Sequence, residues 1–373
     1  MYNPAVGQGS SKQVFNTDTT SHNSFKRRQF TSYISIRTIT VTAVIAIVAI
    51  IMEGTSNGAL FRGVNIGGIL DASSEIGFIA IGVTILMIGG EFDLSVGQSF
   101  VAAGMTFATL YHSIGMLLAL LVALAIGIAI GFVNGLVTLS FGIPSFITTL
   151  GTNYVVAGMI LLITGAAPIS AISLPSSFKI FGGYIFTLPV RWEVVWWIGL
   201  VIIMGIILHK TAFGNHVFAA GGRAEVAHNV GVKVVRTKMI LFMLSGMFAA
   251  FSGVVLFAHL GDIEASAGSG LELEAIAAAV IGGTALFGGI GTVYGGAVGS
   301  LFLGMLTVGL VLSGASTRYY ELFVGIVLIG AVALQAKVDG ISGIIKRVIG
   351  VNQNNFNQEF KLKDLFHINK PTT

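Results

Sequence analysis

The chain has no cysteine, only 6 prolines and few charged residues, and these shortages limit what it can be. Without cysteine, disulfides, thiolate catalysis and cysteine-ligated metal sites are all excluded. Charged residues make up 10% of the chain, whereas a soluble globular domain carries about 25%. The chain therefore has too little polar surface to fold as a soluble protein.

Long apolar runs are what the chain has instead. Hydrophobic residues make up 54% of the sequence, and the runs recur along almost its whole length. A helix needs about 20 apolar residues to cross the hydrocarbon core of a bilayer. The 50 glycines fit such a protein, because small residues let membrane helices approach each other closely. The sequence therefore predicts an all-α, polytopic membrane protein.

We expect about ten transmembrane helices in a membrane domain over residues 34–336, between an N-terminal tail (1–33) and a C-terminal tail (337–373). The first apolar run lacks a small-residue cleavage site, so we expect a retained span rather than a removed signal peptide. The expected spans are 34–52, 75–90, 95–112, 114–139, 144–164, 193–209, 237–258, 272–289, 292–313 and 319–336.

The basic residues predict the orientation. Most of the 20 Lys and Arg fall in the N-terminal region, in the segment 210–238 and in the C-terminal tail. Positive charge favours the cytoplasmic side of a membrane. Even numbers of spans separate these segments, so both termini are expected to be cytoplasmic, with outside loops at 53–74, 165–192 and 259–271. Topology thus explains the net charge of +4, and no nucleic-acid partner is expected.

Two acids, Glu91 and Asp93, stand between strongly apolar runs in GGEFDLSVG (89–97). One interpretation is a tight turn in which Asp93 or Ser95 caps the next helix. The other is a helix break at membrane depth that lines a transport path and carries an intramembrane acid. The residues alone favour the turn, although a cap and a path lining are compatible.

The stretch GFVNGLVTLSFGIPSFITTLGT (131–152) places polar residues inside apolar spans. Asn134 lies in the first span, and Pro144 starts the second, where its missing N–H costs least. Thr148 and Thr149 follow within that helix. Hydrogen bonding between helices is the usual role of such residues in membranes. The alternative is a weakly polar lining for a hydroxyl-rich solute.

The loop TAFGNHVFAAGGRAEVAHNVGVKVVRTK (211–238) is too ordered in pattern for a passive linker. We expect Gly221-Gly222 to break the chain, residues 224–229 to form a short helix and Gly231 to end it. A short exposed helix held between two spans is suited to docking into a groove on a soluble partner. We favour this interpretation over a solvated basic loop that only sets topology.

Two further acids, Glu272 and Glu274, begin the expected span LELEAIAAAVIGGTALFGG at its outer mouth. Paired carboxylates can form an acid–base pair or a cation site. No second cluster of acids, His or Asn accompanies them, so a helix N-terminus that favours negative charge is the better explanation.

The glycine pair Gly288-Gly289 repeats a feature of Gly89-Gly90, because each is followed seven residues later by another glycine. Such an echo is typical of duplicated halves in transporters. Glycine is so frequent here that coincidence is the preferred explanation.

Motifs for chemistry are missing from the sequence. It contains no phosphate-binding loop, nucleophile elbow or His-rich metal pattern. We therefore expect no catalytic residues, no metal site and no ATP hydrolysis by the chain itself. Active transport would take its energy from a partner or from an ion gradient.

Taken in order, four motifs resemble the permease subunits of bacterial ATP-binding cassette importers for monosaccharides, such as the ribose, xylose, galactose and furanosyl autoinducer systems. The matching pieces are GGEFDLSVG (89–97), NG and GIPSFITTLGT within 134–152, FGNHVFAAGGRAEVAHNVGV (213–232) and LELEAIAAAVIGGTALFGGIGTVYGG (271–296). With their spacing they cover roughly residues 75 to 335.

The resemblance implies about ten helices per subunit, paired with a second permease copy or a paralogue around a central path in the inner membrane. Two cytoplasmic ATPase subunits using ATP-Mg would dock beneath, and an extracytoplasmic sugar-binding protein would deliver substrate. The loop 210–238 would contain the coupling helix, with Ala227 and Gly231 at matching positions. The residues nearest the path would be Asp93, Ser95, Asn134 and Thr149.

The sequence departs from the family at two positions. Arg223 follows the Gly-Gly pair where Asn is common, and Glu274 stands where Asp is usual. The extra charge of Arg223 is suited to an acidic patch on the ATPase. Competing functions are a permease for branched-chain amino acids or nucleosides, an ion-coupled secondary transporter and, more distantly, a membrane-embedded enzyme.

Overall fold

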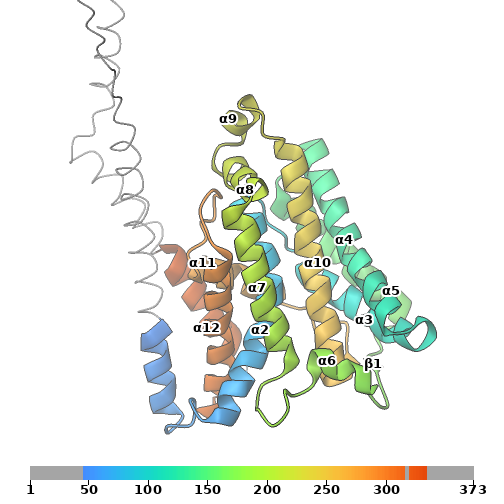
Figure 1. The fold of residues 1–373 in the computed structure, drawn as a ribbon, viewed down its shortest axis with the longest axis vertical. Coiled ribbons are helices and arrows are strands. Elements are labelled where there is room, and N and C mark those ends of the chain that lie inside the picture. Colours follow the sequence, from blue (N-terminus) through green and yellow to red (C-terminus); the bar gives the residue numbers. More distant parts are fainter. Residues whose placement is uncertain (1–44, 316–318, 334–373) are drawn as a thin grey trace, which may run out of the picture.

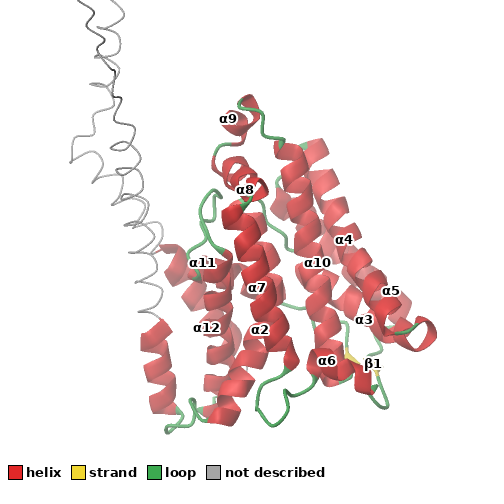
Figure 2. Ribbon diagram, in the orientation of Figure 1, coloured by secondary structure: helices red, strands yellow, loops and turns green. Residues whose placement is uncertain are grey.

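The computed structural model describes residues 45–315 and 319–333, and these fold into a bundle of helices (Figure 1). Helices dominate the part of the chain that the structure describes, where a single pair of two-residue strands joins two loops (Figure 2). The long helices are Ile45–Thr55, α2 (Gly63–Ile88), α3 (Val96–Ile114), α4 (Met116–Phe141), α5 (Ser145–Thr164), α7 (Trp192–Lys210), α8 (Ala212–Gly222), α10 (Val234–Leu260), α11 (Leu271–Ile281), α12 (Val293–Leu312) and Tyr319–Ala333. The short elements are β1 (Ile169–Ser170), η1 (Ser176–Phe178), α6 (Lys179–Gly182), α9 (Ala224–Asn229) and β2 (Asp262–Ile263).

Six of the described helices are long and apolar enough to cross a membrane: α2, α4, α5, α7, α10 and α12. The expected all-α, multi-pass membrane fold is confirmed at this level. The 19-residue α3 is not among the six, and it carries several hydroxyl, amide and imidazole side chains. The helices Ile45–Thr55 and Tyr319–Ala333 are apolar but shorter. Most of the expected first span, 34–52, lies outside the described residues.

The expected boundaries agree closely with α4, α5, α7 and α12 but are wrong for α2. That helix begins at Gly63 rather than near residue 75, so the expected outside loop 53–74 is much shorter. This stretch contains Gly67 and Asp71. In the structure Gly67 packs directly against the backbone of Pro189, and Asp71 pairs with Arg191. These tertiary partners allow a polar, glycine-containing stretch to be helical.

The expected span 272–289 is also wrong. Helix α11 contains 11 residues and ends at Ile281, and an irregular segment leads from there to α12. Gly283, Gly288 and Gly289 in this segment all have positive φ angles. Helical residues do not adopt that conformation, which glycine takes at little cost. The glycines therefore end the helix well short of the length needed to span the bilayer.

Helix α10 lies at the centre of the bundle and packs against α2, α3 and α4, while α12 packs against α2 and α11 (Figure 1). Glycine allows these contacts to be close, as predicted. A β-carbon at Gly127 of α4 would overlap the carbonyl oxygen of Gly246 of α10. A β-carbon at Gly253 would likewise overlap the carbonyl of Phe100 on α3. Backbones at such distances gain dispersion contacts, which hold membrane helices together.

The two ends of the bundle differ in structure. One end carries α8 and α9, at the top of Figure 1. The opposite end carries the segment with β1, η1 and α6, where β1 pairs antiparallel with β2. Between the two ends, α4 and α5 lie at the rim of the bundle and expose most of their apolar side chains. Such faces suit lipid or a second protein chain.

Candidate functional site

The segment GGEFDLS between α2 and α3 is a helix break inside the bundle. Helix α2 ends at Ile88, Gly90 has a positive φ of 81°, and α3 begins at Val96. Asp93 and Ser95 are both fully buried, so the segment is not an exposed surface turn. Of the two predicted caps, the Ser95 alternative is wrong, because its side chain makes no capping hydrogen bond to α3, whereas the Asp93 carboxylate accepts from the backbone N–H of Ser95 directly before the helix.

Asp93 instead organises a buried polar cluster with two other predicted residues. Its Oδ1 accepts hydrogen bonds from the Ser95 N–H at 2.9 Å, from the Ser95 hydroxyl at 2.7 Å and from the Asn134 amide at 3.4 Å. The same amide donates to Ser95 Oγ at 2.8 Å. Asn134 comes from α4 and is also fully buried. The structure thus brings three of the four predicted residues into direct contact.

The fourth residue, Thr149, holds the same segment from α5. Its hydroxyl accepts a hydrogen bond from the Leu94 N–H at 2.9 Å and donates to the Ser145 carbonyl at 2.8 Å. One turn earlier, the Ser145 hydroxyl accepts from the Phe92 N–H at 3.0 Å. Two backbone donors of the broken helix are thereby satisfied by α5. Sequence analysis missed Ser145, although its spacing of four from Thr149 places both hydroxyls on one face of the helix.

Some of the hydrogen-bonding capacity of this region is unused. Asp93 Oδ2 and Asn134 Oδ1 of the cluster, and Thr148 Oγ1 on α5, are buried and have no hydrogen-bond partner among the described residues. Buried polar atoms in folded proteins nearly always have a partner, which is often water or a ligand. The cluster therefore offers amide and hydroxyl groups, rather than charge alone, to a polar solute.

Glu91 has a different environment from Asp93. Its Oε1 lies 2.5 Å from the Nζ of Lys238, near the start of α10, and both side chains keep some solvent exposure. The two acids of GGEFDLSVG therefore have separate roles. Asp93 organises the interior of the break, and Glu91 ties the break to α10.

The segment 210–238 contains two helices. The predicted short helix is confirmed as α9, and Gly231 follows it with a positive φ of 90°. Helix α8 was not predicted: Gly221-Gly222 form its last residues, and the break falls at Arg223 instead. The Thr211 hydroxyl starts α8 by accepting a hydrogen bond from the Gly214 N–H.

Helix α9 presents an exposed apolar surface. Val226 in α9 and Val230 directly after it are 53% and 74% exposed, whereas Ala227 is buried. Arg223 is also exposed at the beginning of this helix. Helix α9 lies at the tip of the bundle (Figure 1), where a soluble protein can reach it. This arrangement suits a partner with an apolar groove.

Glu272 and Glu274 lie in the first turn of α11, where the helix dipole favours negative charge. The Tyr320 hydroxyl donates a hydrogen bond to Glu274 at 3.0 Å. A β-carbon at Gly97 would lie 2.7 Å from a carboxylate oxygen of Glu272, so this acid lies against the first turn of α3. The start of α11 is therefore next to the helix break.

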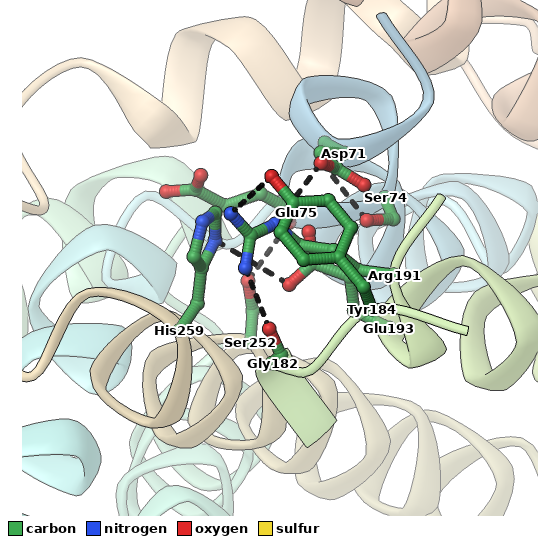
Figure 3. Close-up of polar contacts among 9 residues, drawn as sticks. All are labelled: Asp71, Ser74, Glu75, Gly182, Tyr184, Arg191, Glu193, Ser252 and His259. Carbon is green, nitrogen blue, oxygen red and sulfur yellow. Dashed lines mark hydrogen bonds and ion pairs between the residues drawn. The ribbon is translucent and has the colours of Figure 1, made fainter. Parts of the chain in front are cut away.

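A second group of acids lies at the opposite end of the bundle from α9, and sequence analysis did not identify it (Figure 3). Arg191 pairs with Asp71 of α2 at 3.2 Å and donates to the carbonyl of Gly182 at 2.7 Å and to the Tyr184 hydroxyl at 3.0 Å. Its guanidinium also lies 4.2 Å from the centre of the Tyr184 ring. One arginine thus joins α2, α6 and the start of α7.

Two more acidic residues, Glu193 and Glu75, lie in this group, the second through its backbone carbonyl. Glu193 of α7 is 2% exposed and faces Nδ1 of His259 at 3.6 Å. The Ser252 hydroxyl donates to the backbone carbonyl of Glu75 at 2.8 Å (Figure 3). These contacts join α2, α7 and α10. Among the described residues, no group of three or more His, Asp or Glu side chains is arranged to hold a metal ion.

Comparison with known proteins gives a consistent result. Residues 65–332 match the family described as branched-chain amino acid transport system / permease component. The chain is 37% identical to the ribose import permease protein RbsC of Bacillus subtilis, covering 78% of this chain and 90% of that protein. It is 37% identical to the probable ABC transporter permease protein YphD of Escherichia coli, covering 82% and 91% respectively. It is 34% identical to the autoinducer 2 import system permease protein LsrC of Klebsiella pneumoniae, covering 80% and 86%. No solved structure matches the chain.

Proposed function

The chain belongs to the permease-component family of branched-chain amino acid transport systems, and we propose that it forms the path for a monosaccharide or related small sugar in an ATP-binding cassette importer. The observation that carries this proposal is the similarity, over about four-fifths of the chain, to permeases named for ribose and autoinducer 2 import. The unused amide and hydroxyl groups of the buried cluster suit a hydroxyl-rich solute.

We assign the path residues to the cluster at the helix break. Asp93, Ser95, Asn134 and Thr149 come from three parts of the chain and share one hydrogen-bonded network around residues 93–95. A weakly polar path is sufficient if a separate extracytoplasmic binding protein supplies the affinity for sugar. Weak binding in the path also lets the solute leave on the other side.

The coupling loop is the second functional part. A cytoplasmic ATPase subunit binds the α8–α9 segment through the exposed valines of α9, with Gly221, Gly222, Arg223, Ala227 and Gly231 shaping the docking site. ATP-Mg binds to that partner and not to this chain. Closure of two ATPase subunits moves α8 and α9, rocks two permease copies outward and gives alternating access.

The topology follows from this docking. The α8–α9 end faces the cytoplasm, as its basic residues favour, and both termini lie on the same side of the bacterial inner membrane. The segments with β1, α6 and β2 then face outward, where the binding protein delivers the sugar. The expected ten membrane segments comprise the six long apolar helices together with α3, α11, Ile45–Thr55 and Tyr319–Ala333, of which α11 is too short to cross the bilayer.

One competing substrate class is supported by a specific observation. The family description names branched-chain amino acids, so a permease for such an amino acid is the second candidate. It would share the fold and the coupling loop. An amino acid carries both a carboxylate and an ammonium group, so it would require charged partners in the path, whereas a sugar requires hydrogen-bonding groups.

Co-purification from the native membrane in mild detergent tests the proposal. We expect an ATPase subunit and a sugar-binding protein to accompany the chain, and the ligand of that binding protein then identifies the substrate. A binding protein specific for leucine or valine would favour the second candidate. Solute movement by the chain alone, in ATP-free vesicles with an ion gradient, would overturn both.

A further inference from the structure

Three Gly-Gly pairs that are far apart in the sequence meet in the structure. Gly89-Gly90 ends α2, Gly221-Gly222 ends α8, and Gly288-Gly289 lies between α11 and α12. The Gly289 N–H donates a hydrogen bond to the Ile88 carbonyl at 2.8 Å. This hydrogen bond joins the segment after α2 to the segment after α11, and Gly221 of α8 lies against both segments. We call this contact the glycine junction.

The glycine junction leaves no space for a side chain at Gly221 or Gly288. A β-carbon at Gly221 would overlap the carbonyl oxygen of Ile88. A β-carbon at Gly288 would lie 2.7 Å from the Gly221 carbonyl oxygen and 2.8 Å from Gly90 Cα. Ordinary van der Waals contacts of carbon are about 3.5–4.0 Å. Backbone therefore rests directly on backbone, without flexible side chains between the segments that would absorb a displacement.

A second contact connects the same parts of the molecule. Lys238 lies one turn into α10, which directly follows α9 and the loop after it, and it pairs with Glu91 beside the glycine junction. The helix break 89–95 is thus attached to both sides of the α8–α9 segment. The attachment to α8 is steric, and the attachment to α10 is electrostatic.

We propose that the glycine junction and the Glu91–Lys238 pair are the positioning elements that transmit movement of the coupling loop to the helix break. This inference rests on the proposed function. Movement of α8 displaces Gly221, and the close contact passes the displacement to Ile88 and Gly90. Asp93 and Ser95 follow within a few residues, so the polar cluster changes shape when the ATPase subunits close.

Gly89-Gly90 and Gly288-Gly289, the two pairs with the same spacing to a later glycine, are therefore also in contact with the same residue in the structure. Gly90 and Gly288 both lie against Gly221, so α8 reaches the break after α2 and the break after α11 at the same time. One movement of α8 therefore displaces the break after α2 and the break after α11 together. Packed contacts of this kind change between discrete arrangements rather than deforming gradually.

Gly221→Ala in the assembled importer is the first test, with transport and ATP hydrolysis measured on the same reconstituted complex. The added methyl separates α8 from Ile88, so we expect transport per ATP hydrolysed to fall about tenfold while ATP hydrolysis persists. Gly222→Ala adds a methyl 4.0 Å from Gly289 Cα and is expected to cause a smaller loss. Gly199→Ala on α7, which has open space around it, serves as the unchanged control.

The Glu91–Lys238 pair provides a second test that does not depend on tight packing. Glu91→Lys and Lys238→Glu each place like charges together, and we expect each to lower transport per ATP by about fivefold. The double exchange Glu91→Lys with Lys238→Glu restores opposite charges and is expected to recover most of the loss. A role in stability alone would lower the amount of assembled complex without changing this ratio.

The outcomes separate the inference from the function on which it rests. If wild-type complexes couple transport to ATP but Gly221→Ala and the single charge variants couple equally well, the transmission role is wrong and the importer function stands. If Gly221→Ala does not assemble, the charge exchange decides, and absence of rescue would overturn the inference. If the wild-type chain neither binds an ATPase nor transports with ATP, the proposed function itself fails.

Discussion

The hydroxyl of Thr149 accepts a hydrogen bond from the backbone N–H of Leu94 at 2.9 Å, and this contact closes the helix break against α5. Leu94 lies between the end of α2 and the start of α3. Backbone donors inside a membrane protein need a partner, because lipid offers none. The position of α5 and the shape of the break therefore depend on each other.

Replacing Thr149 by Val tests this dependence. The variant keeps the size of the side chain but removes the acceptor, so the Leu94 N–H is left buried and unpaired, at a cost of about 1–3 kcal/mol. We expect a lower midpoint of thermal unfolding in detergent and reduced uptake. Thr149→Ser keeps the hydroxyl and is expected to retain the midpoint. If Thr149→Val and the wild type unfold at the same midpoint temperature, this hydrogen bond does not stabilise the helix break.

Two substitutions of Asp93 distinguish its role as a hydrogen-bond acceptor from the role of its negative charge. Asp93→Ala removes the acceptor for Ser95 and Asn134, and each unpaired donor costs about 1–3 kcal/mol, so we expect little folded protein. Asp93→Asn keeps one oxygen in place and is expected to fold and to transport. Uptake into vesicles, with and without an imposed proton gradient, is the measurement. A well-folded Asp93→Asn protein that no longer transports would indicate that the charge itself is needed.

Arg191 holds α2, α6 and α7 together at the end opposite α9. Arg191→Gln leaves Asp71 without its cation, and we expect a loss of about 2 kcal/mol, less than for a fully buried pair because both side chains retain some solvent contact. Thermal unfolding of Arg191→Gln, Asp71→Asn and the double variant measures the coupling between the two residues. Losses that simply add in the double variant would show that the pair is not coupled.

A substitution at Gly231 tests the docking surface that we propose for the ATPase. Gly231→Arg adds a long charged side chain next to α9 and strains a residue with a φ of 90°, so we expect the ATPase subunit to be lost from the purified complex. Gly142→Arg is a matched control, because Gly142 also has a positive φ and open space around it but lies between α4 and α5. Strain of this kind costs about 1–2 kcal/mol in each variant. Equal loss of the ATPase from both variants would contradict a docking role for the α9 loop.

Sequence analysis predicted a large part of the fold. The boundaries of α4, α5, α7 and α12 follow directly from apolar length and from residues such as Pro144, which stands at the N-terminal end of α5. The α9 helix and the glycine after it were also predicted. The start of α2, the end of α11 and the existence of α8 were not predicted correctly. Each of these depends on glycine or polar residues whose conformation is set by distant contacts.

The candidate site was predicted in its members but not in its arrangement. Asp93, Ser95, Asn134 and Thr149 were selected one by one as polar residues in apolar surroundings. That they form one network with Ser145 required α4 and α5 to be packed against the break. The Arg191 group was missed because its acids fall in, or directly after, the outside loops expected at 53–74 and 165–192, where charge is ordinary in a sequence.

The sequence by itself determined that this chain crosses a membrane several times as helices, because apolar length and helix-ending residues act locally and can be recognised wherever they occur. Only the tertiary structure decided which backbones touch. Three contacts join residues that are separated by more than a hundred positions in the sequence: the Ile88–Gly289 hydrogen bond, the Glu91–Lys238 pair and the packing of Gly221 against Ile88. Such contacts depend on the relative placement of whole helices, and glycine has no side chain whose chemistry could indicate its neighbour in advance.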